Sequence, residues 1–265
     1  MQSHSVLSQD VSVSYRVIGA GSRDVFLIHG WMVSGAVYDD LIAALDTEGL
    51  RLIVIDLRGS GRSGRPSSGY TIAQYATDVL AVADAVGSRS FVAVGHSMGG
   101  QIAQWLAATT PERVSGLVLL CPVPASGIPL PPSAQALFRN CGENRGMQQT
   151  ILGLACKQLS DEARERLLDD SQGVSAECVA QAFDTWTTGG FSERLSAINT
   201  PTLVVGTDDP FLPPAFLRQA VMSLIRGARL AILPGPGHYV QVERPRETAA
   251  LLEAFFAALP HPPSY

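Results

Sequence analysis

The chain has 265 residues, of which 46% are hydrophobic and 16% are charged, and its formal net charge at pH 7 is −5. This length accommodates one large α/β domain with a small insertion, and this composition excludes a disordered chain. The negative net charge argues against an electrostatic surface for nucleic acids or anionic membranes, so we expect neither as a partner.

The distribution of apolar residues and cysteines favours a cytoplasmic protein. The first eight residues lack a basic start followed by an apolar core, so no signal peptide is expected. No apolar run approaches the roughly 18 residues that a membrane helix needs. Four widely spaced cysteines, without a C-x-x-C pair, favour buried thiols in a reducing compartment, so we expect no metal site. They are Cys121, Cys141, Cys156 and Cys178.

Short apolar runs alternate with helix-like stretches along most of the chain, which predicts a mainly parallel sheet covered by helices. The first run, 11–17, alternates polar and apolar residues and predicts a half-exposed edge strand. The later runs are continuously apolar and predict strands buried on both faces. These runs are 24–28, 51–55, 91–94, 114–120, 202–205 and 228–233.

Helical periodicity is clear over 72–86 and near the carboxyl terminus. Thr71 and Gln74 predict a capping box at the start of the first of these helices. In the second, the apolar residues between Leu251 and Leu259 share one face, and Pro245 suits the first turn.

The alternation of strands and helices stops between Ala125 and Leu195, where several prolines lead into helical patterning without a strand. We interpret this stretch as a helical insertion at 125–195. The core of the fold would then comprise residues 1–124 and 196–265.

The stretch Gly95-His96-Ser97-Met98-Gly99 follows an apolar strand and precedes a helical segment. A serine nucleophile of the G-x-S-x-G type requires this strand–turn–helix context. Small neighbours relieve crowding around a strained serine, and the helix amino terminus favours developing negative charge. A glycine-rich turn without catalytic function is the alternative.

A serine nucleophile needs a base, and the base needs an orienting acid. His238 follows the last predicted strand, where α/β sheets place their chemistry, whereas His96 is adjacent to the serine and more typical of a structural role. Asp208 and Asp209 follow the preceding strand, and either satisfies the order Ser…Asp…His. From the residues alone both acids stay open, as does a plain turn.

A competing motif lies at Gly59–Gly64, which satisfies G-x-G-x-x-G after a strand and has Asp84 beyond it. Dinucleotide binding by this motif requires a helix that begins at the glycines. Here Arg65-Pro66-Ser67-Ser68-Gly69 follows instead, so we expect no dinucleotide and no other cofactor.

Four motifs together resemble the α/β-hydrolase fold superfamily over almost the whole chain. They are the oxyanion loop His29-Gly30-Trp31, the D-x-R-G-x-G-x-S loop from Asp56 to Ser63, the G-x-x-D-x-x-x-P loop from Gly206 to Pro213, and Gly237-His238. The resemblance implies an α/β fold with a helical cap over the site. It also implies a serine-nucleophile esterase or lactonase.

The resemblance assigns roles to individual residues. It implies a catalytic triad of Ser97, Asp209 and His238, and an oxyanion hole made by the backbone N–H groups of Trp31 and Met98. Some relatives carry the acid after an earlier strand, but 121–124 offers no carboxylate. Relatives with an aspartate nucleophile are disfavoured by the serine itself.

The predicted substrate pocket is apolar, and part of it lies under the cap. The cap aromatics and one methionine line the substrate cavity or form the cap's own core. The candidate pocket residues are His29, Gly30, Phe138, Met147, Phe183, Trp186, Phe191 and Tyr239.

The expected activity is hydrolysis of a small, largely apolar ester or lactone through an acyl-enzyme, without a cofactor. Carbon–carbon bond hydrolysis, perhydrolysis and cofactor-free oxygenation are the alternatives on the same fold. A ligand receptor that retains the triad is a third possibility, because the fold alone does not determine function.

Overall fold

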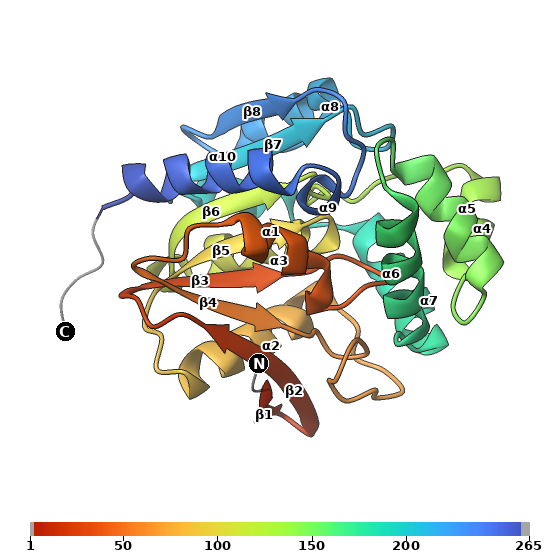
Figure 1. The fold of residues 1–265 in the computed structure, drawn as a ribbon, viewed down its shortest axis with the longest axis horizontal. Helices are drawn as coiled ribbons and strands as arrows, with labels where there is room; N and C mark the ends of the chain where they lie inside the picture. Colours follow the sequence, from red (N-terminus) through yellow and green to blue (C-terminus); the bar gives the residue numbers. More distant parts are fainter. Residues whose placement is uncertain (1–2, 261–265) are drawn as a thin grey trace.

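The computed structural model describes residues 3–260 of the chain. His261 therefore lies outside the described residues. Within them, the strands form one sheet in the order β1-β2-β4-β3-β5-β6-β7-β8 (Figure 1). The strands are β1 (Ser3–Ser8), β2 (Val11–Ile18), β3 (Arg23–Ile28), β4 (Leu50–Ile55), β5 (Phe91–His96), β6 (Val114–Leu120), β7 (Thr202–Thr207) and β8 (Arg229–Leu233).

The sheet is parallel from β4 to β8, and β1 and β2 add an antiparallel pair at one side. This arrangement confirms the mainly parallel sheet that the sequence predicts. The helices are α1 (Asp39–Ala44), α2 (Ile72–Ala85), α3 (Met98–Thr109), α4 (Pro132–Arg139), α5 (Arg145–Ala155), α6 (Asp161–Gln172), α7 (Ala176–Thr188), α8 (Pro214–Ala220), α9 (Val240–Glu243) and α10 (Pro245–Ala258). Short 3₁₀ turns are η1 (Gly35–Tyr38), η2 (Pro111–Arg113), η3 (Ser192–Ala197) and η4 (Met222–Leu224).

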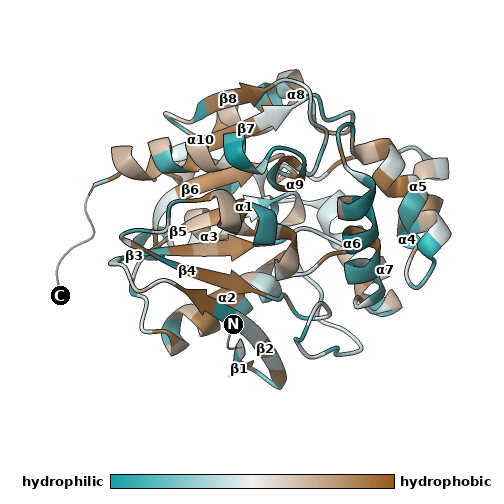
Figure 2. Cartoon of the chain, viewed as in Figure 1, coloured by the Kyte–Doolittle hydropathy of each residue, from teal (hydrophilic) through white to brown (hydrophobic). Residues whose placement is uncertain are grey.

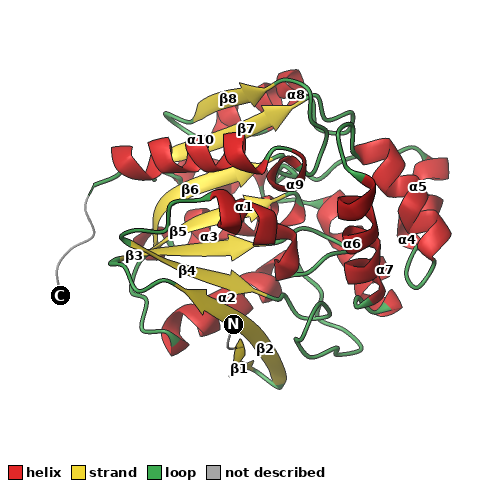
Figure 3. Ribbon diagram, viewed as in Figure 1, coloured by secondary structure: helices red, strands yellow, loops and turns green. Residues whose placement is uncertain are grey.

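Helices cover both faces of the central strands (Figure 3). The edge strand β8 is exposed or half-buried along its length, so the prediction that 228–233 is buried on both faces was wrong. In β3, Phe26 and Ile28 belong to the apolar cluster shared with α2 and α3, whereas Val25 and Leu27 belong to the cluster shared with α1 and α10. Successive side chains of a strand point to opposite faces, so a continuous apolar run suits a strand covered on both sides. The central strands are accordingly hydrophobic along their length (Figure 2).

The prediction of an edge strand at 11–17 was wrong. β2 pairs with β4 on one side and with β1 on the other, so β1 forms the edge. Residues 3–8 contain few apolar side chains, and their strand is stabilised by its hairpin with β2. The hairpin turns at Gln9, whose φ is 53°.

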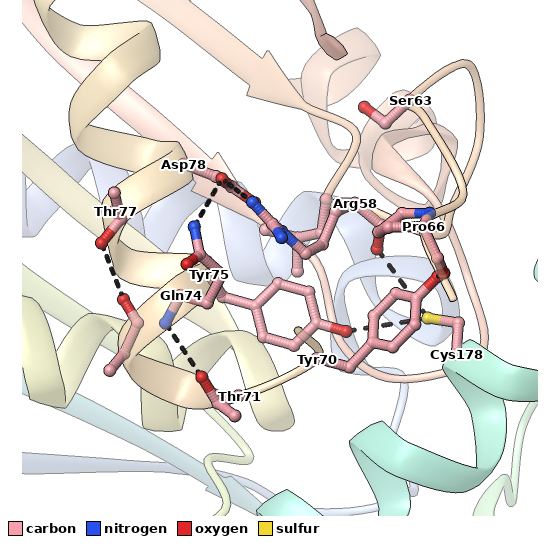
Figure 4. Close-up of polar contacts among 12 residues, drawn as sticks. Arg58, Ser63, Pro66, Tyr70, Thr71, Gln74, Tyr75, Thr77, Asp78 and Cys178 are labelled. Atoms are coloured by element: carbon pink, nitrogen blue, oxygen red, sulfur yellow. Dashed lines mark hydrogen bonds and ion pairs between the residues drawn. The ribbon is translucent and has the colours of Figure 1, made fainter. Parts of the chain in front are cut away.

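The start of α2 carries half of the predicted capping box. The Thr71 side chain accepts a hydrogen bond from the Gln74 backbone N–H at 3.2 Å. The Gln74 side chain turns away from the cap and donates to Asp78 at 3.4 Å. Asp78 in turn receives two hydrogen bonds of 2.6 Å from Arg58, forming a buried ion pair between the loop after β4 and α2 (Figure 4).

Helices α4 to α7 lie beyond the carboxyl ends of the parallel strands, to the right in Figure 1. They occupy most of the stretch 125–195 for which the sequence predicts helices without strands. The division into a core and a cap at these boundaries stays a prediction.

Candidate active site

Ser97 lies in a sharp turn between β5 and α3 and has a strained backbone, with φ 54° and ψ −119°. A Cβ atom on Gly95 would overlap the backbone of Gly99, and one on Gly99 would overlap the carbonyl of Ile28. The positions two residues before and two residues after the serine therefore both require glycine. The strand–turn–helix arrangement that the sequence predicts is present.

Backbone contacts to the neighbouring strand hold this turn in place. The Ser97 N–H donates to the Leu120 carbonyl at 3.0 Å, and the Ser97 carbonyl accepts from Val123 at 3.0 Å. A strained residue persists where the surrounding structure fixes it in this way, and such residues cluster at functional sites.

His238 is paired with a buried carboxylate. Its Nδ1 lies 2.6 Å from Asp209 Oδ2, and the other Asp209 oxygen accepts from the Phe211 backbone N–H at 2.8 Å. Asp209 is only 1% exposed. With Nδ1 bound to the carboxylate, Nε2 is the ring nitrogen left for proton transfer, and His238 lines the same cavity as Ser97.

The two neighbouring aspartates have different surroundings. Asp208 is exposed, and its carboxylate accepts a hydrogen bond of 3.0 Å from the Gly235 backbone N–H. Asp209, at the next position, points into the protein and meets the imidazole. The contact with His238 therefore belongs to the acid that the family resemblance implied.

His96 supports the loop that carries His238. Its Nε2 lies 2.9 Å from the His238 carbonyl oxygen, to which it donates. Burial, followed by the nearby His238 imidazole, lowers the pKa of His96 well below its usual value, so its ring is neutral. The structure thus gives His96 a structural contact, as the sequence favours.

One proposed oxyanion donor, Met98, adjoins the serine, and the other, Trp31, follows a loop residue that lies close to it. Met98 is the first residue of α3, where backbone N–H groups have no partner within the helix. The oxyanion loop passes close to the serine, since a Cβ atom on Gly30 would lie 3.0 Å from the Ser97 Cβ. The next residue, Trp31, is fixed by its indole N–H, which donates to the Val179 carbonyl of α7 at 2.8 Å.

Ser97 and His238 open onto a small cavity of about 50 Å³. The remaining lining residues are apolar or aromatic: Trp31, Met32, Val123, Ile128, Leu130, Phe138, Ile151, Ala155, Trp186, Phe211, Leu212 and Tyr239. Phe138, Trp186 and Tyr239 are therefore placed in the wall as the sequence suggests. A pocket with one polar edge and apolar walls is typical of a small-molecule site.

The other predicted pocket residues lie behind this wall or away from it. Phe183 packs edge-on against Trp186, with ring centroids 5.1 Å apart, and Phe191 packs against Trp105 at the same spacing. Met147 is partly buried against the main apolar cluster. Phe183 thus packs within the helical stretch, as the alternative of a cap core predicts. Phe191 instead packs on α3, which lies outside that stretch, so neither predicted role fits it.

His29 and Gly30 belong to the framework of the oxyanion loop. The Nδ1–H of His29 donates to the Gly30 carbonyl at 2.7 Å, and its Nε2 accepts from the Leu57 backbone N–H at 2.9 Å. Burial lowers the pKa of His29, which matches a neutral ring with one donor and one acceptor. Neither His29 nor Gly30, both candidate pocket residues, lines the cavity onto which Ser97 and His238 open.

Sequence reasoning missed several wall residues next to the motifs it identified. Phe211 and Leu212 directly follow Asp209, and Met32 follows Trp31. Adjacency to motif residues was the available signal for these positions. Ile128 and Leu130 lie in the segment between β6 and α4 and Ile151 lies on α5, and none of them adjoins a motif.

Other kinds of site find no support among residues 3–260. No group of histidine, cysteine or acidic side chains there is arranged to hold a metal ion. Gly59–Gly64 forms a closed turn in which the Gly59 N–H donates to the Gly64 carbonyl at 2.9 Å, and α2 begins only at Ile72. No helix in this range is long and apolar enough to span a bilayer.

Comparisons with known proteins bear on the family and the fold. A model of the alpha/beta hydrolase family matches residues 25–251. A non-heme haloperoxidase from Rhodococcus erythropolis is 31% identical over 252 residues, covering 87% of this chain and 90% of that protein. Est816, described as an N-acyl homoserine lactone degrading enzyme, is 31% identical with a TM-score of 0.79, covering 95% of this chain and 100% of that one.

A bromoperoxidase from Bacillus anthracis has the same fold, with a TM-score of 0.89 at 22% sequence identity. The match covers 97% of this chain and 100% of that one. The α/β-hydrolase fold that the sequence motifs imply is thereby confirmed.

Proposed function

Because the chain belongs to the alpha/beta hydrolase family, we propose that it is a serine hydrolase of small carboxylic esters or lactones. The observation that carries the proposal is the 2.6 Å contact between His238 and the buried Asp209, beside a cavity that Ser97 also lines. Nucleophile, base and orienting acid each come from the end of a different strand, and this is how such sheets build active sites.

In the proposed reaction, Ser97 Oγ attacks the substrate carbonyl carbon while His238 Nε2 takes the hydroxyl proton. Asp209 stabilises the resulting imidazolium. The backbone N–H groups of Trp31 and Met98 bind the negative oxygen of the tetrahedral intermediate. Its collapse expels the alkoxide, which takes the proton from His238 and leaves an acyl group on the serine.

Water completes the cycle. His238 removes a proton from a water molecule, whose oxygen attacks the acyl carbon and forms a second tetrahedral intermediate. This intermediate releases Ser97 with the proton returned to its oxygen, and the carboxylic acid leaves. In a lactone the alcohol and the acid are parts of one molecule, so ring opening gives a hydroxy acid.

The cavity walls support a small and largely apolar substrate. Among the described residues that line it, none is Arg, Lys, Asp or Glu, so a charged substituent would be buried without a partner. The likeness to Est816, an N-acyl homoserine lactone degrading enzyme, supports the lactone option. Four unpaired thiols support a cytoplasmic location, as part of the proposal.

Perhydrolysis is the second candidate, favoured by the 31% identity to a non-heme haloperoxidase. Hydrogen peroxide attacking the acyl-enzyme in place of water would release a peracid. The apolar walls of the cavity do not separate the two reactions, because both proceed through the same acyl-enzyme.

The test is a panel of p-nitrophenyl esters of increasing chain length together with lactones, with and without hydrogen peroxide. The Ser97→Ala protein serves as the blank. We expect acid release from short esters or lactones and labelling of Ser97 by a fluorophosphonate probe. Unlabelled serine together with unchanged turnover in the blank would refute the proposal, and peracid as the main product would favour the second candidate.

A further inference from the structure

Glu243, the last residue of α9, is a buried carboxylate that holds four backbone N–H groups. Its Oε2 accepts from Gly237 at 2.9 Å, from Lys157 at 2.9 Å and from Gln158 at 2.7 Å. Its Oε1 accepts from Tyr239 at 3.2 Å. Glu243 is 8% exposed, and these donors supply the hydrogen bonds that a buried carboxylate needs.

These donors come from two segments that are far apart in the sequence. Gly237 and Tyr239 flank His238 in the loop after β8, whereas Lys157 and Gln158 follow α5. A single carboxylate therefore joins the loop that carries the proposed base to the segment between α5 and α6.

A second contact joins the same two segments. The backbone N–H of His238 donates to the Ala155 carbonyl, at the end of α5, at 2.9 Å. A Cβ atom on Gly237 would overlap that carbonyl. Each of residues 237–239 thus donates its backbone N–H either to Glu243 or to the carbonyl at the end of α5.

The imidazole of His238 has its own partner in Asp209, but that contact fixes only one edge of the ring. The distance from Nε2 to the serine also depends on where the backbone of the loop lies. A displacement of about 1 Å in a reacting group costs on the order of 10²-fold in rate.

We infer that Glu243 is a positioning residue for His238. It ties the loop 237–239, which carries the proposed base, to the segment 155–158, so that the two segments move together. The inference rests on the proposed function, since it assigns the positioned group its role as the base. It also predicts that movement of α5 relative to the sheet shifts His238 directly.

The experiment compares Glu243→Ala and Glu243→Gln with the wild-type protein, using the best ester of the panel. Glu253→Ala is the matched control, because Glu253 also accepts a backbone N–H, that of Asp46 at 2.9 Å, but on α10. The measurements are kcat and KM, the melting temperature, and hydrogen–deuterium exchange of the peptides that contain 155–158 and 235–239.

For Glu243→Ala we expect kcat to fall about 10- to 100-fold with KM changed by less than about threefold, and both peptides to exchange faster. Glu243→Gln keeps one oxygen of the same shape, so it should recover part of kcat. Glu253→Ala should leave kcat and both peptides unchanged. A loss of kcat without a change in KM, partly restored in Glu243→Gln, distinguishes a positioning role from a general loss of stability.

A folded Glu243→Ala protein with wild-type kcat would overturn the inference, as would exchange that stays slow in both peptides. If the alanine variant does not fold, the glutamine variant decides by the same two measurements. Failure of the proposed function looks different: Ser97 would stay unlabelled in the wild-type protein, whatever the Glu243 variants do to exchange.

Discussion

The two walls of the cavity are built by different physical means. On the sheet side, Ser97, Asp209 and His238 are held by backbone hydrogen bonds at strand ends and by a buried carboxylate. On the helical side, Phe138 stacks on Trp31 with ring centroids 5.7 Å apart, and side-chain packing fixes the shape. Changes on the sheet side should therefore cost turnover, and changes on the helical side should alter substrate choice.

Ion pairs in the core and between the helices of the helical side also differ in how exposed they are. The Arg58–Asp78 pair in the core has side chains that are 4% and 0% exposed, whereas the Arg139–Asp184 pair between α4 and α7 has 51% and 48%. Exposed pairs contribute about 0–1 kcal/mol, while removing one partner of a buried pair costs roughly 3–5 kcal/mol. The exposed Arg139–Asp184 pair thus contributes little to the packing of α4 against α7, and this part of the helical wall is the easier one to reshape.

The largest effect should come from Ser97→Ala, which removes the proposed nucleophile from the sheet side. We expect kcat to fall by up to about 10⁶-fold, because the members of a triad act as a unit. The hydrogen bonds that hold the turn use backbone atoms, so the melting temperature should change little. Steady-state kinetics and thermal unfolding measure the two quantities. Substantial residual turnover would contradict the assignment of catalysis to the residues on the sheet side.

Asp209→Asn comes next, with Asp208→Asn as its control at the adjacent position. Loss of the buried carboxylate removes the group that orients the imidazole and stabilises its charged form, and should lower kcat about 10⁴-fold. Asp208 is exposed and faces Gly235, so its variant should keep kcat within about threefold. Equal losses in the two variants would show that the acid role does not belong to Asp209.

Motifs on the sheet side were predictable because short-range constraints determine them. Gly95 and Gly99 are required by contacts with backbone, and such contacts leave a pattern in the sequence. The choice between Asp208 and Asp209 was not determined by the residues, since both follow the same strand and only burial separates them. The family resemblance supplied that choice.

On the helical side, prediction was weaker for a physical reason. Apolar patterning identifies helices, but the face that meets the cavity is set by how each helix docks. Phe138 and Trp186 reach the cavity, whereas Phe183 lies behind Trp186 and Phe191 packs on Trp105. These roles look alike in sequence, because buried aromatic side chains serve both.

Phe138→Ala tests the helical wall and should change selectivity more than catalysis. Removing the ring enlarges the cavity, so the preference between short and longer acyl chains should shift by about 10- to 200-fold in kcat/KM. Phe191→Ala is the control: its ring packs on Trp105 outside the cavity, so it should lower the melting temperature without shifting the preference. The ester panel measures both variants, and an unchanged preference in Phe138→Ala would contradict the division between the walls.

The smallest expected effect is the difference in stability between Ser97→Gly and Ser97→Ala, which tests the strain in the turn. Neither variant has a nucleophile, so they differ in the Cβ methyl group and in the backbone energy that this group causes. A non-glycine residue at φ 54° and ψ −119° pays roughly 1–3 kcal/mol, and glycine removes that strain but loses about 0.5–1 kcal/mol through the entropy of its unfolded chain. The glycine variant should therefore be about 1 kcal/mol more stable in urea unfolding. If the alanine variant were instead about 0.5–1 kcal/mol more stable than the glycine variant, the turn would store no strain, and the backbone contacts of the sheet side would have nothing to offset.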